Sequence, residues 1–298
     1  MIRLRPIGES DFQTVLDIFV EAFSPSPVPP IEYIANLCHT EPEGCLLAER
    51  DGVPVGYAAA HRSGSIGYIG TVAVRNAHRG HGYGKLLTEA VRDYLQTRCR
   101  VVGLAVDPKS SRNLNLYQSC GFVPTLPGCQ AYKKRNADDP KSAVPSSVTT
   151  ARQLGGKIEA AFAAIGEWSS EVFPGLDLSR DLQLFATRYP DRLWIDWDGD
   201  QPRGFLAYED RFRGDPWGAI RPGPGDDDSL RALIDALEGS VDEEVLFFHH
   251  HTAFHRLSGI LAGRGYRVAS HNTCMVVAES AERWPTRSDA LFLRPWWT

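Results

Sequence analysis

The sequence predicts a mixed α/β fold that is divided between two domains. Along the whole chain, short apolar runs typical of strands alternate with segments in which apolar residues recur at helical spacing. A length of 298 residues, 43% of them hydrophobic, is long for one core and fits two domains of roughly 150 residues each. Residues 136–147 are polar, carry two prolines and have no periodicity, as expected of a linker. We therefore expect one domain over residues 1–135 and a second over residues 148–298.

Composition and charge exclude several classes of function. A net charge of −5 and an isoelectric point near 6.0 lack the basic footprint of a nucleic-acid-binding protein. No apolar stretch reaches the ~18 residues of a membrane span, and residues 1–6 do not resemble a signal peptide. The six cysteines include no CxxC pair, so we expect reduced and mostly packed thiols. These features predict a cytoplasmic protein without nucleic-acid or membrane partners.

Each element of the first domain follows from a local pattern. Apolar runs bounded by turn residues predict strands at residues 2–5, 45–49, 55–61, 66–74, 101–106, 122–123 and 130–133. Apolar residues at helical spacing predict helices at residues 12–23, 31–37, 85–97 and 110–119. Asp51-Gly52 between two strand-like runs is a strong hairpin signal. The predicted order is β-α-α-β-β-β-α-β-α-β-β, a mixed sheet.

A glycine-rich turn joins the strand that ends at Val74 to the helix that begins near Lys85. The turn reads Arg79-Gly80-His81-Gly82-Tyr83-Gly84. A helix N-terminus offers free backbone N–H groups and partial positive charge, so it can hold a pyrophosphate. Glycines let the backbone approach the phosphate oxygens and adopt positive φ. The turn lacks the spacing of a dinucleotide site or a P-loop, and by itself it is equally typical of an ordinary glycine turn.

A second motif follows the strand at residues 101–106. Its helix contains Leu116-Tyr117 and ends at Gly121-Phe122. The two motifs together resemble the GNAT acetyltransferases, with Arg79-x-x-Gly82-x-Gly84 in place of that family's Arg/Gln-x-x-Gly-x-Gly/Ala signature. The downstream helix is similar to the family's N-x-x-A-x-x-L-Y-x-x-x-G-F. It departs from that pattern at Ser110, where Asn is usual, and at Asn113, where a small apolar residue is usual.

The resemblance implies a domain that binds acetyl-CoA and passes its acetyl group to an amine, without a metal. It places the pantetheine arm along the strand at Val72–Val74, as an extra strand would lie, and the pyrophosphate at the glycine turn. The residues that it implies for cofactor binding are Val72, Ala73, Val74, Arg79, Gly80, His81, Gly82, Tyr83, Gly84, Lys85, Ser110, Asn113 and Tyr117.

The resemblance also assigns a general acid but leaves the general base open. Tyr117 would donate a proton to the departing thiolate, and a backbone N–H near Val72 would polarise the acetyl carbonyl. No Asp or Glu occurs between Asp51 and Glu89, where many family members carry a basic carboxylate. The candidates are Glu49, Asp107, His61, His78 or a chain of waters. We expect that no single residue is essential as the base.

The second half repeats the pattern of the first in altered form. A hairpin at residues 193–208 parallels residues 46–60, and Gly265 parallels Gly121 at an offset of 144. At that offset three functional positions change: Tyr117 becomes Leu261, Gly82 becomes Asp226 and Gly84 becomes Asp228. Carboxylates about 4 Å apart repel by roughly 1–4 kcal/mol. We therefore infer a degenerate GNAT-like domain that does not bind CoA, the alternative being an unrelated α/β domain.

The histidines of the second half invite a metal site but lack the ligands for one. No Asp, Glu or Cys falls between Val245 and Val268 to complete a ligand set with His249, His250, His251 and His255, and HExxH spacing is absent. His249 and His251 would instead line an acceptor pocket, which the acidic balance of this half would suit. The apolar end at residues 291–298 would pack on a domain face or on a second subunit, so monomer and homodimer both stay open.

The leading interpretation is an N-acetyltransferase whose acceptor attacks acetyl-CoA directly in a ternary complex. The acceptor is a small-molecule or peptide amine that the sequence does not name. An alternative is a non-catalytic acyl-CoA-binding sensor or assembly module, which the missing strand carboxylate and Ser110 favour slightly. A third interpretation places catalysis in the second half. The run Asp226-Asp227-Asp228 argues against it.

Overall fold

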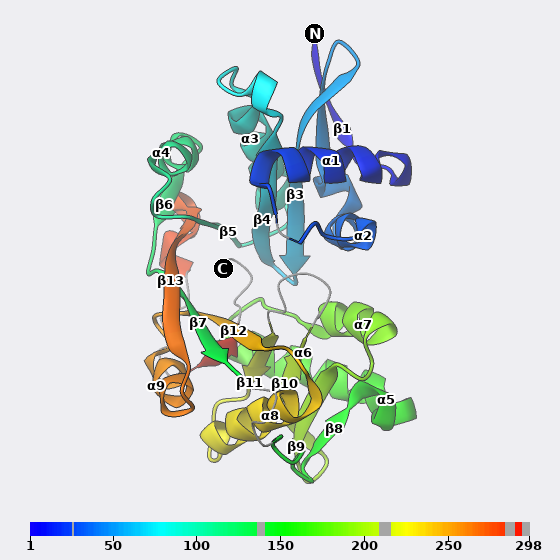
Figure 1. The fold of residues 1–298 in the computed structure, drawn as a ribbon, viewed down its shortest axis with the longest axis vertical. Helices are drawn as coiled ribbons and strands as arrows, with labels where there is room; N and C mark the ends of the chain where they lie inside the picture. The colour runs from blue at the N-terminus through cyan, green and yellow to red at the C-terminus, as the bar shows by residue number, and fades with distance from the viewer. Residues whose placement is uncertain (26, 136–140, 209–215, 284–289, 294–298) are drawn as a thin grey trace. The chain divides into compact units, whose positions relative to one another are not determined.

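The computed structural model describes residues 1–25, 27–135, 141–208, 216–283 and 290–293. The chain forms two compact units (Figure 1). Of the described residues, unit 1 contains those up to 125 together with residues 273–283, and unit 2 contains those from 126 to 272 together with residues 290–293. Both units are mixed α/β structures, so the predicted fold class is confirmed.

Unit 1 is built on a sheet with the strand order β1-β2-β3-β4-β5-β13-β6. Its strands are β1 (Ile2–Pro6), β2 (Leu46–Arg50), β3 (Val53–Ser63), β4 (Ile66–Val74), β5 (Val101–Val106), β6 (Phe122–Pro124) and the second half of β13 (Arg267–Val277). Among the described strands of unit 1, β4 and β5 run parallel, and the other neighbours are antiparallel. The hairpin signal is confirmed, since Asp51 (φ 52°) and Gly52 (φ 82°) turn β2 into β3.

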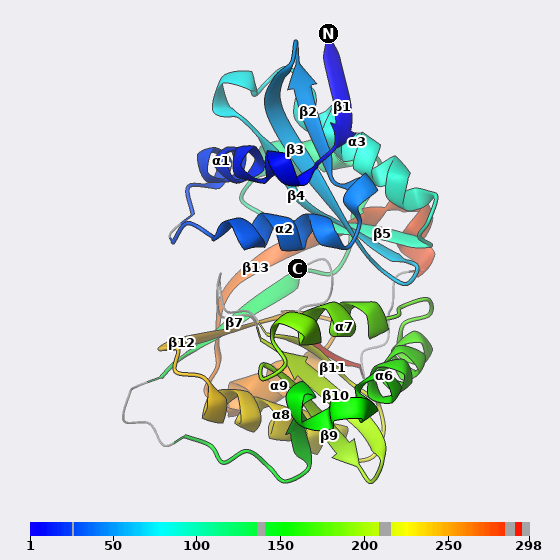
Figure 2. The same ribbon diagram turned by 90° about the vertical axis from the view of Figure 1, so that its right-hand side faces the viewer.

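Helices cover both faces of the unit 1 sheet (Figure 2). They are α1 (Phe12–Phe23), α2 (Ile31–His39), α3 (Tyr83–Gln96) and α4 (Ser111–Ser119). The apolar residues of α3 lie at helical spacing, and Leu87, Val91 and Leu95 are fully buried against the sheet. The other face carries α1 and α2, which pack on β3. This packing fixes α3, and with it the glycine turn, at the end of β4.

Unit 2 is built on a sheet with the order β13-β7-β12-β14-β11-β10-β9-β8. Its strands are the first half of β13, β7 (Gly128–Lys134), β8 (Val148–Thr150), β9 (Leu193–Asp198), β10 (Gln201–Ala207), β11 (Trp217–Ile220), β12 (Val245–His251) and β14 (Leu291–Leu293). Its helices are α5 (Ala151–Leu154), α6 (Ile158–Val172), α7 (Ser179–Arg188), α8 (Asp226–Ser240) and α9 (His255–Gly263). The predicted second-half hairpin is present as β9 and β10.

Left-handed glycines occur at similar places in the two halves, after α4 and α9 and before α3 and α8. Gly121 (φ 84°) and Gly265 (φ 87°) end α4 and α9 in the same left-handed conformation. Before α3 and α8, the matching left-handed residues are Gly82 (φ 82°) and Gly225 (φ 80°). Gly225 therefore takes the place that the constant offset gave to Asp226, because a positive φ favours glycine.

The division of the chain differs from the predicted boundary at residue 135. The strand predicted at residues 130–133 is present as β7, but it pairs with β12 in the sheet of unit 2. In unit 1 the second half of β13 lies beside β5 instead, with Thr273–Val276 opposite Gly103–Val106. Local sequence patterns predict that a strand forms but not which strand it pairs with. The sequence therefore could not predict that β7 pairs in unit 2 and the second half of β13 pairs in unit 1. The first part of the predicted linker, residues 136–140, lies outside the described residues.

Two further expectations concern the cysteines and the membrane. All six cysteines are free thiols, and all but Cys99 are buried, as the sequence predicts for packed thiols. Within the described ranges, none of the helices combines the length and apolar character needed to cross a membrane.

Candidate functional site

The glycine turn of unit 1 owes its shape to two glycines with left-handed backbones. Gly80 has φ 85° and Gly82 has φ 82°. A Cβ atom built on either residue would meet no heavy atom within 4 Å. The glycines are therefore needed for the backbone conformation and not to relieve crowding. The open space around both residues leaves room for a ligand beside the turn.

The turn leads directly into the N-terminus of α3. The amide of Leu86 donates to the carbonyl of Gly82 at 3.0 Å, which makes it the first intrahelical bond after the turn. The amides of Tyr83, Gly84 and Lys85 precede that bond, so they belong to the N-terminal set that a helix cannot satisfy internally. Together with the helix dipole they form a site for an anion such as a pyrophosphate.

The two cations expected at the turn are held by the protein itself. The Arg79 guanidinium donates to the carbonyl oxygens of Val74 and Ala22, each at 3.2 Å. The Lys85 ammonium lies 3.8 Å from the Glu89 carboxylate on the next helical turn. Arg79 thus fastens the turn to the ends of β4 and α1, while its charge stays near the N-terminus of α3.

The strands β4 and β5 separate at the place where the pantetheine arm was expected. They pair only through Ile66–Tyr68 and Val101–Gly103. Beyond these residues β4 continues to Val74 with β3 on one side, and no described strand of unit 1 pairs with its other edge. The backbone of Val72, Ala73 and Val74 therefore has no described strand of unit 1 on this edge, and we call this unpaired stretch the gap between β4 and β5. An unpaired strand edge carries backbone groups that an extended ligand could bond as a strand would.

A bulge in β4 lies beside this gap. The register between β3 and β4 shifts between Ala58 and Ala60, so that Gly70 and Thr71 both lie opposite Ala59. Bulges redirect backbone groups and are common next to active sites. The N–H near Val72 that was expected to polarise the acetyl carbonyl follows this irregular segment directly.

Tyr117 lies on α4 with its phenol largely buried. Its ring packs edge-on against Phe122, with the ring centroids 6.3 Å apart. Burial raises the pKa of Tyr117 to about 12, and the neighbouring Cys120 thiol adds to this. The hydroxyl is therefore protonated at neutral pH, as a proton donor must be. Leu116 beside it approaches the α3 residue Gly84, so α4 packs against the helix that carries the glycine turn.

The two positions that depart from the family pattern lie at the start of α4. Ser110 precedes the first helical residue and makes no capping hydrogen bond with its side chain. Asn113 is exposed on the first turn of the helix. Neither side chain is buried in the core, so both are accessible at the helix end nearest to the end of β5.

Both carboxylates considered for the base are engaged in local structure. Glu49 accepts from the guanidinium of Arg5 at 2.8 Å, across the pair of strands β1 and β2. The carboxylate of Asp107 accepts from the amide of Lys109 at 2.9 Å and closes a turn after β5. Both carboxylates therefore already have a hydrogen-bond partner in the fold.

The two histidines considered for the base also lie apart from each other in the fold. His61, on β3, has its ring nitrogens 3.1 Å from the Thr40 hydroxyl and 3.3 Å from the Ser63 hydroxyl. His78 precedes the glycine turn, and its ring centroid lies 6.4 Å from that of Tyr83. The four candidates come from different elements, so the structure does not gather them into one catalytic cluster.

Glu21 is a site residue that the sequence analysis missed. Its carboxylate, near the end of α1, accepts from the amide of Asn76 and from the guanidinium of Arg75, each at 2.6 Å. The bond from the Asn76 amide is the main cause that lowers the pKa of Glu21, and the Arg75 bond adds to it. Glu21 thereby joins α1 to the segment that leads into the glycine turn. More than fifty residues separate these partners, so no local pattern signals the contact.

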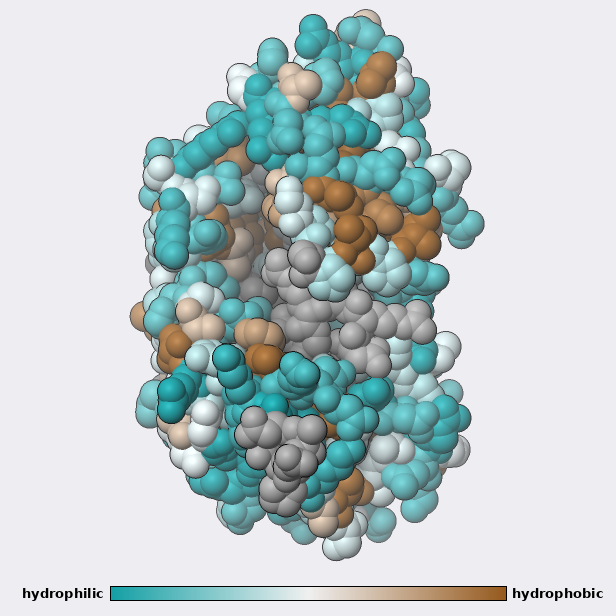
Figure 3. All heavy atoms as spheres, viewed as in Figure 1, coloured by the Kyte–Doolittle hydropathy of each residue, from teal (hydrophilic) through white to brown (hydrophobic). Residues whose placement is uncertain are grey.

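An apolar patch is exposed where α1 passes into α2. Figure 3 shows it as brown spheres over these two helices. Its members are Phe23 (49% exposed), Val28 (57%) and Ile31 (40%). Beneath it, the ring of Phe19 lies 5.4 Å from that of Tyr33 on α2. Exposed apolar clusters of this kind often mark ligand or protein contacts.

The corresponding helix end in unit 2 is already occupied by a carboxylate. Asp226, the first residue of α8, is only 8% exposed and accepts from Arg256 at 2.7 Å. Arg256 also pairs with Asp227 at 2.5 Å. The contact with Arg256 is the main cause that lowers the pKa of Asp226, so the carboxylate stays ionised. A negative side chain thus stands where unit 1 leaves an anion site open.

The histidine-rich strand β12 is largely buried. His250 and His251 are each 2% exposed, and burial lowers both pKa values, that of His251 to about 4. Both rings are therefore neutral near pH 7. In the described part of the chain, no group of three or more His, Cys, Asp or Glu side chains is placed to hold a metal.

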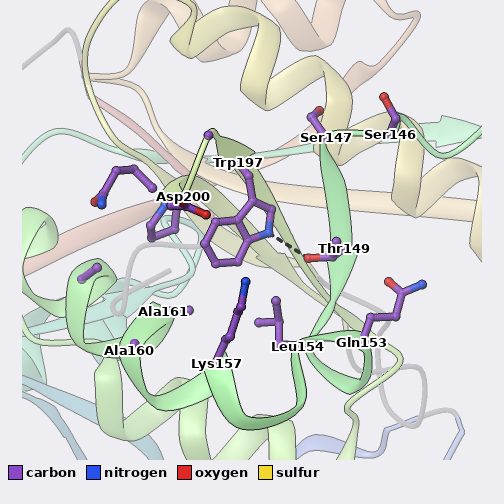
Figure 4. A pocket seen from close by; sticks show the side chains of 14 residues that line it. Ser146, Ser147, Thr149, Gln153, Leu154, Lys157, Ala160, Ala161, Trp197 and Asp200 are labelled. Carbon is purple, nitrogen blue, oxygen red and sulfur yellow. Dashed lines mark hydrogen bonds between the residues drawn. The ribbon is translucent and has the colours of Figure 1, made fainter.

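Unit 2 also contains a cavity of about 880 Å³ (Figure 4). It lies among β8, the start of α6 and the turn between β9 and β10. Trp197 forms one wall and donates from its indole N–H to the Thr149 hydroxyl at 2.8 Å. Lys157 points toward the same space (Figure 4). None of the residues expected to bind cofactor lines this cavity.

Comparisons with known proteins agree with the site in unit 1. A family model described as "Acetyltransferase (GNAT) family" matches residues 12–122. The yeast (Saccharomyces cerevisiae) protein N-alpha-acetyltransferase 30 is 31% identical over 126 residues, which make up 40% of this chain and 67% of that protein. The chain belongs to the GNAT acetyltransferase family. It is accordingly an acyltransferase, and enzymes of this family use acetyl-CoA.

Solved structures extend the likeness in fold to both units. A proposed acetyltransferase from Pyrococcus horikoshii is 16% identical with a TM-score of 0.68, covering 92% of this chain and 88% of its own. A GCN5-related N-acetyltransferase from Sphaerobacter thermophilus is 18% identical with a TM-score of 0.62, covering 92% and 95%. At such identities the likeness concerns the fold alone. The family model ends within unit 1, so the GNAT-like character of unit 2 stays a proposal.

Proposed function

We propose that unit 1 transfers the acetyl group of acetyl-CoA to an amine that attacks the thioester directly. The gap between β4 and β5 carries this proposal, because it is bordered by a free strand edge and by a helix N-terminus. The α3 amides and the turn of Gly80 and Gly82 would hold the pyrophosphate. The backbone of Val72–Val74 would bond the pantetheine arm along its length.

The chemical step follows from groups on the protein. The amine nitrogen forms a bond to the acetyl carbon while the carbon–sulfur bond breaks. The Tyr117 hydroxyl, which its raised pKa keeps protonated, would donate its proton to the departing sulfur and regain one from solvent. The nitrogen would lose its proton to water, since Glu49 and Asp107 are bound to neighbours in the fold.

A peptide α-amine is the acceptor that the comparisons favour among small-molecule and peptide amines. The matched yeast relative is named an N-alpha-acetyltransferase. The exposed residues Phe23, Val28 and Ile31 would suit an apolar side chain near the peptide N-terminus. Unit 2 would be a GNAT-like domain without cofactor that supports the acceptor side or a dimer, and the protein would act in the cytoplasm.

The test is a transfer assay in which CoA thiol release is followed with a panel of amines. The panel would contain short peptides with free N-termini, the same peptides with blocked N-termini and one lysine, and small polyamines. We expect release that depends on a free N-terminus. Binding of acetyl-CoA without transfer to any member would instead favour the sensor or assembly module.

A further inference from the structure

In unit 2, the strands β11 and β12 are separated by β14, which is formed by residues 291–293. β14 runs antiparallel to β11, with Leu291 opposite Ile220, Phe292 opposite Ala219 and Leu293 opposite Gly218. On its other side Leu293 lies opposite His250 of β12. In the described part of unit 2, β11 and β12 therefore meet only through β14.

The corresponding place in unit 1 is the gap between β4 and β5. β11 follows β10 as β4 follows β3, and β12 precedes α9 as β5 precedes α4. In unit 1 that gap borders the N-terminus of α3. In unit 2 it borders α8, whose N-terminus holds the Asp226 carboxylate. Protein groups thus occupy both positions in unit 2 that a cofactor would fill. β14 takes the place of the extended pantetheine arm, and the Asp226 carboxylate takes the place of the phosphates.

The residues of the inserted strand are as buried as those of the hydrophobic core. Ala290, Leu291 and Phe292 are 1%, 1% and 2% exposed. The ring of Phe292 lies 5.9 Å from that of Phe254, which precedes α9. Apolar burial and strand pairing on both sides are the two forces that hold an added peptide strand in a sheet.

We propose that β14 is a peptide substitute for the pantetheine arm in unit 2. The slot between β11 and β12 is a strand-binding groove, and the chain's own residues 290–293 occupy it and close it to acyl-CoA. The comparison of β14 with the pantetheine arm rests on the proposed function of unit 1. The binding of β14 between β11 and β12 does not depend on that function. The experiment therefore has separate arms for the strand and for the cofactor.

The first arm removes the strand and returns it as a peptide. A chain that ends at Asp289 should melt roughly 10 °C lower, because it loses two fully buried apolar side chains from a domain of this size. A fluorescent peptide of residues 287–298 should bind the shortened chain with one site and restore the melting temperature. The same peptide with Phe292→Asp should not bind, since it would bury a charge. Equal binding of both peptides, or of neither, would overturn the proposal.

A second variant covers the case in which the shortened chain does not fold. A specific protease site is inserted between Arg287 and Ser288 and is cut after the full chain has folded. The released segment should stay bound through gel filtration and exchange slowly with the labelled peptide. Loss of the segment from a chain that remains folded would overturn the proposal.

The second arm asks whether the cofactor fits the emptied slot. In the shortened chain, Asp226→Gly clears the helix N-terminus and Gly82→Asp removes the site in unit 1. Saturating CoA should then weaken binding of the labelled peptide at least tenfold. Unchanged peptide affinity would refute the cofactor comparison. If acetyl-CoA fails to bind unit 1 in the intact chain, the proposed function fails, while the peptide arm still tests the strand.

Discussion

Units 1 and 2 each have a long helix that begins after a left-handed glycine, and they differ in what lies beside the start of that helix. In each, a left-handed glycine starts a long helix, Gly82 before α3 and Gly225 before α8. In unit 1 the helix end and the adjoining gap are free of other described strands. In unit 2 Asp226 and β14 occupy the equivalent places. The difference teaches that backbone geometry makes an anion site possible, while one side chain and one strand decide whether it is open.

The largest expected contrast concerns the equivalent positions of α4 and α9. Tyr117→Phe should lower kcat by about 10²–10⁴-fold with little change in stability, because the proton donor is lost and the ring stays. Leu261→Ala should leave kcat unchanged but lower the free energy of unfolding by about 2–5 kcal/mol, because Leu261 is 1% exposed. Stopped-flow assays and denaturant titrations measure the two effects. A Tyr117→Phe variant with wild-type kcat would remove the general acid from the account.

The ion pair at the start of α8 should give the next largest effect. Arg256→Ala would leave the nearly buried Asp226 without its partner, and we expect a loss of about 1–3 kcal/mol, moderated by the partial exposure of Arg256. Arg152→Ala, which breaks the exposed pair with Asp191, is the matched control and should leave the unfolding midpoint unchanged.

The same pair predicts a dependence on pH. Arg256 lowers the pKa of Asp226 in the folded state. The stabilisation is therefore complete above the unfolded value of about 4 and is lost as the pH falls through the lower folded value. The difference in melting temperature between wild type and Arg256→Ala should shrink in acid. A gap that stays constant down to pH 2 would show that the pair does not stabilise the fold through its charge.

A smaller and equal effect is expected at the glycines that end α4 and α9. Gly121→Ala and Gly265→Ala should each cost about 1 kcal/mol, because φ values of 84° and 87° disfavour a side chain. Urea unfolding of both variants checks this. Clearly unequal costs would show that the two units do not share the same turn.

The smallest effects are expected at the candidates for the base. Alanine at Glu49, Asp107, His61 or His78 should each reduce kcat by less than about tenfold, since water accepts the proton in this account. The pH–rate profiles of the four variants give the readout. A loss above about 10²-fold in one of them would identify a base that the account lacks.

Local pattern predicted much of the fold and the core of the site. The hairpin at Asp51-Gly52, the helix after the glycine turn and the helix that carries Tyr117 follow from turn chemistry and periodicity, and the structure contains each of them. These features depend on neighbours within a few residues. The shift from Asp226 to Gly225 shows the limit, because a constant offset cannot follow an insertion or deletion between two halves.

Long-range pairing could not be predicted in the same way. The sequence predicted β7 as an ordinary strand, and nothing in its residues indicates that it lies beside β12. The residues of β13 likewise give no indication that its second half lies beside β5. The apolar end at residues 291–298 predicted packing on a domain face or on a second subunit, but not the insertion between two strands that residues 291–293 show. Residues 294–298 lie outside the described residues. The contacts of Glu21 could not be predicted either, because its partners Arg75 and Asn76 are distant in the sequence and lie beside it only in the folded chain.

Calorimetric titration with acetyl-CoA tests the central contrast most directly. Wild type should bind one molecule per chain. Gly82→Asp and Gly225→Asp place the same charge at the start of α3 and of α8, on backbones with φ 82° and 80°. A Cβ at Gly225 would also lie 3.3 Å from the Arg203 guanidinium, whereas one at Gly82 would meet no heavy atom within 4 Å. The account predicts that Gly82→Asp abolishes binding while Gly225→Asp leaves both stoichiometry and affinity unchanged. Two sites in wild type, or binding that survives Gly82→Asp, would contradict it.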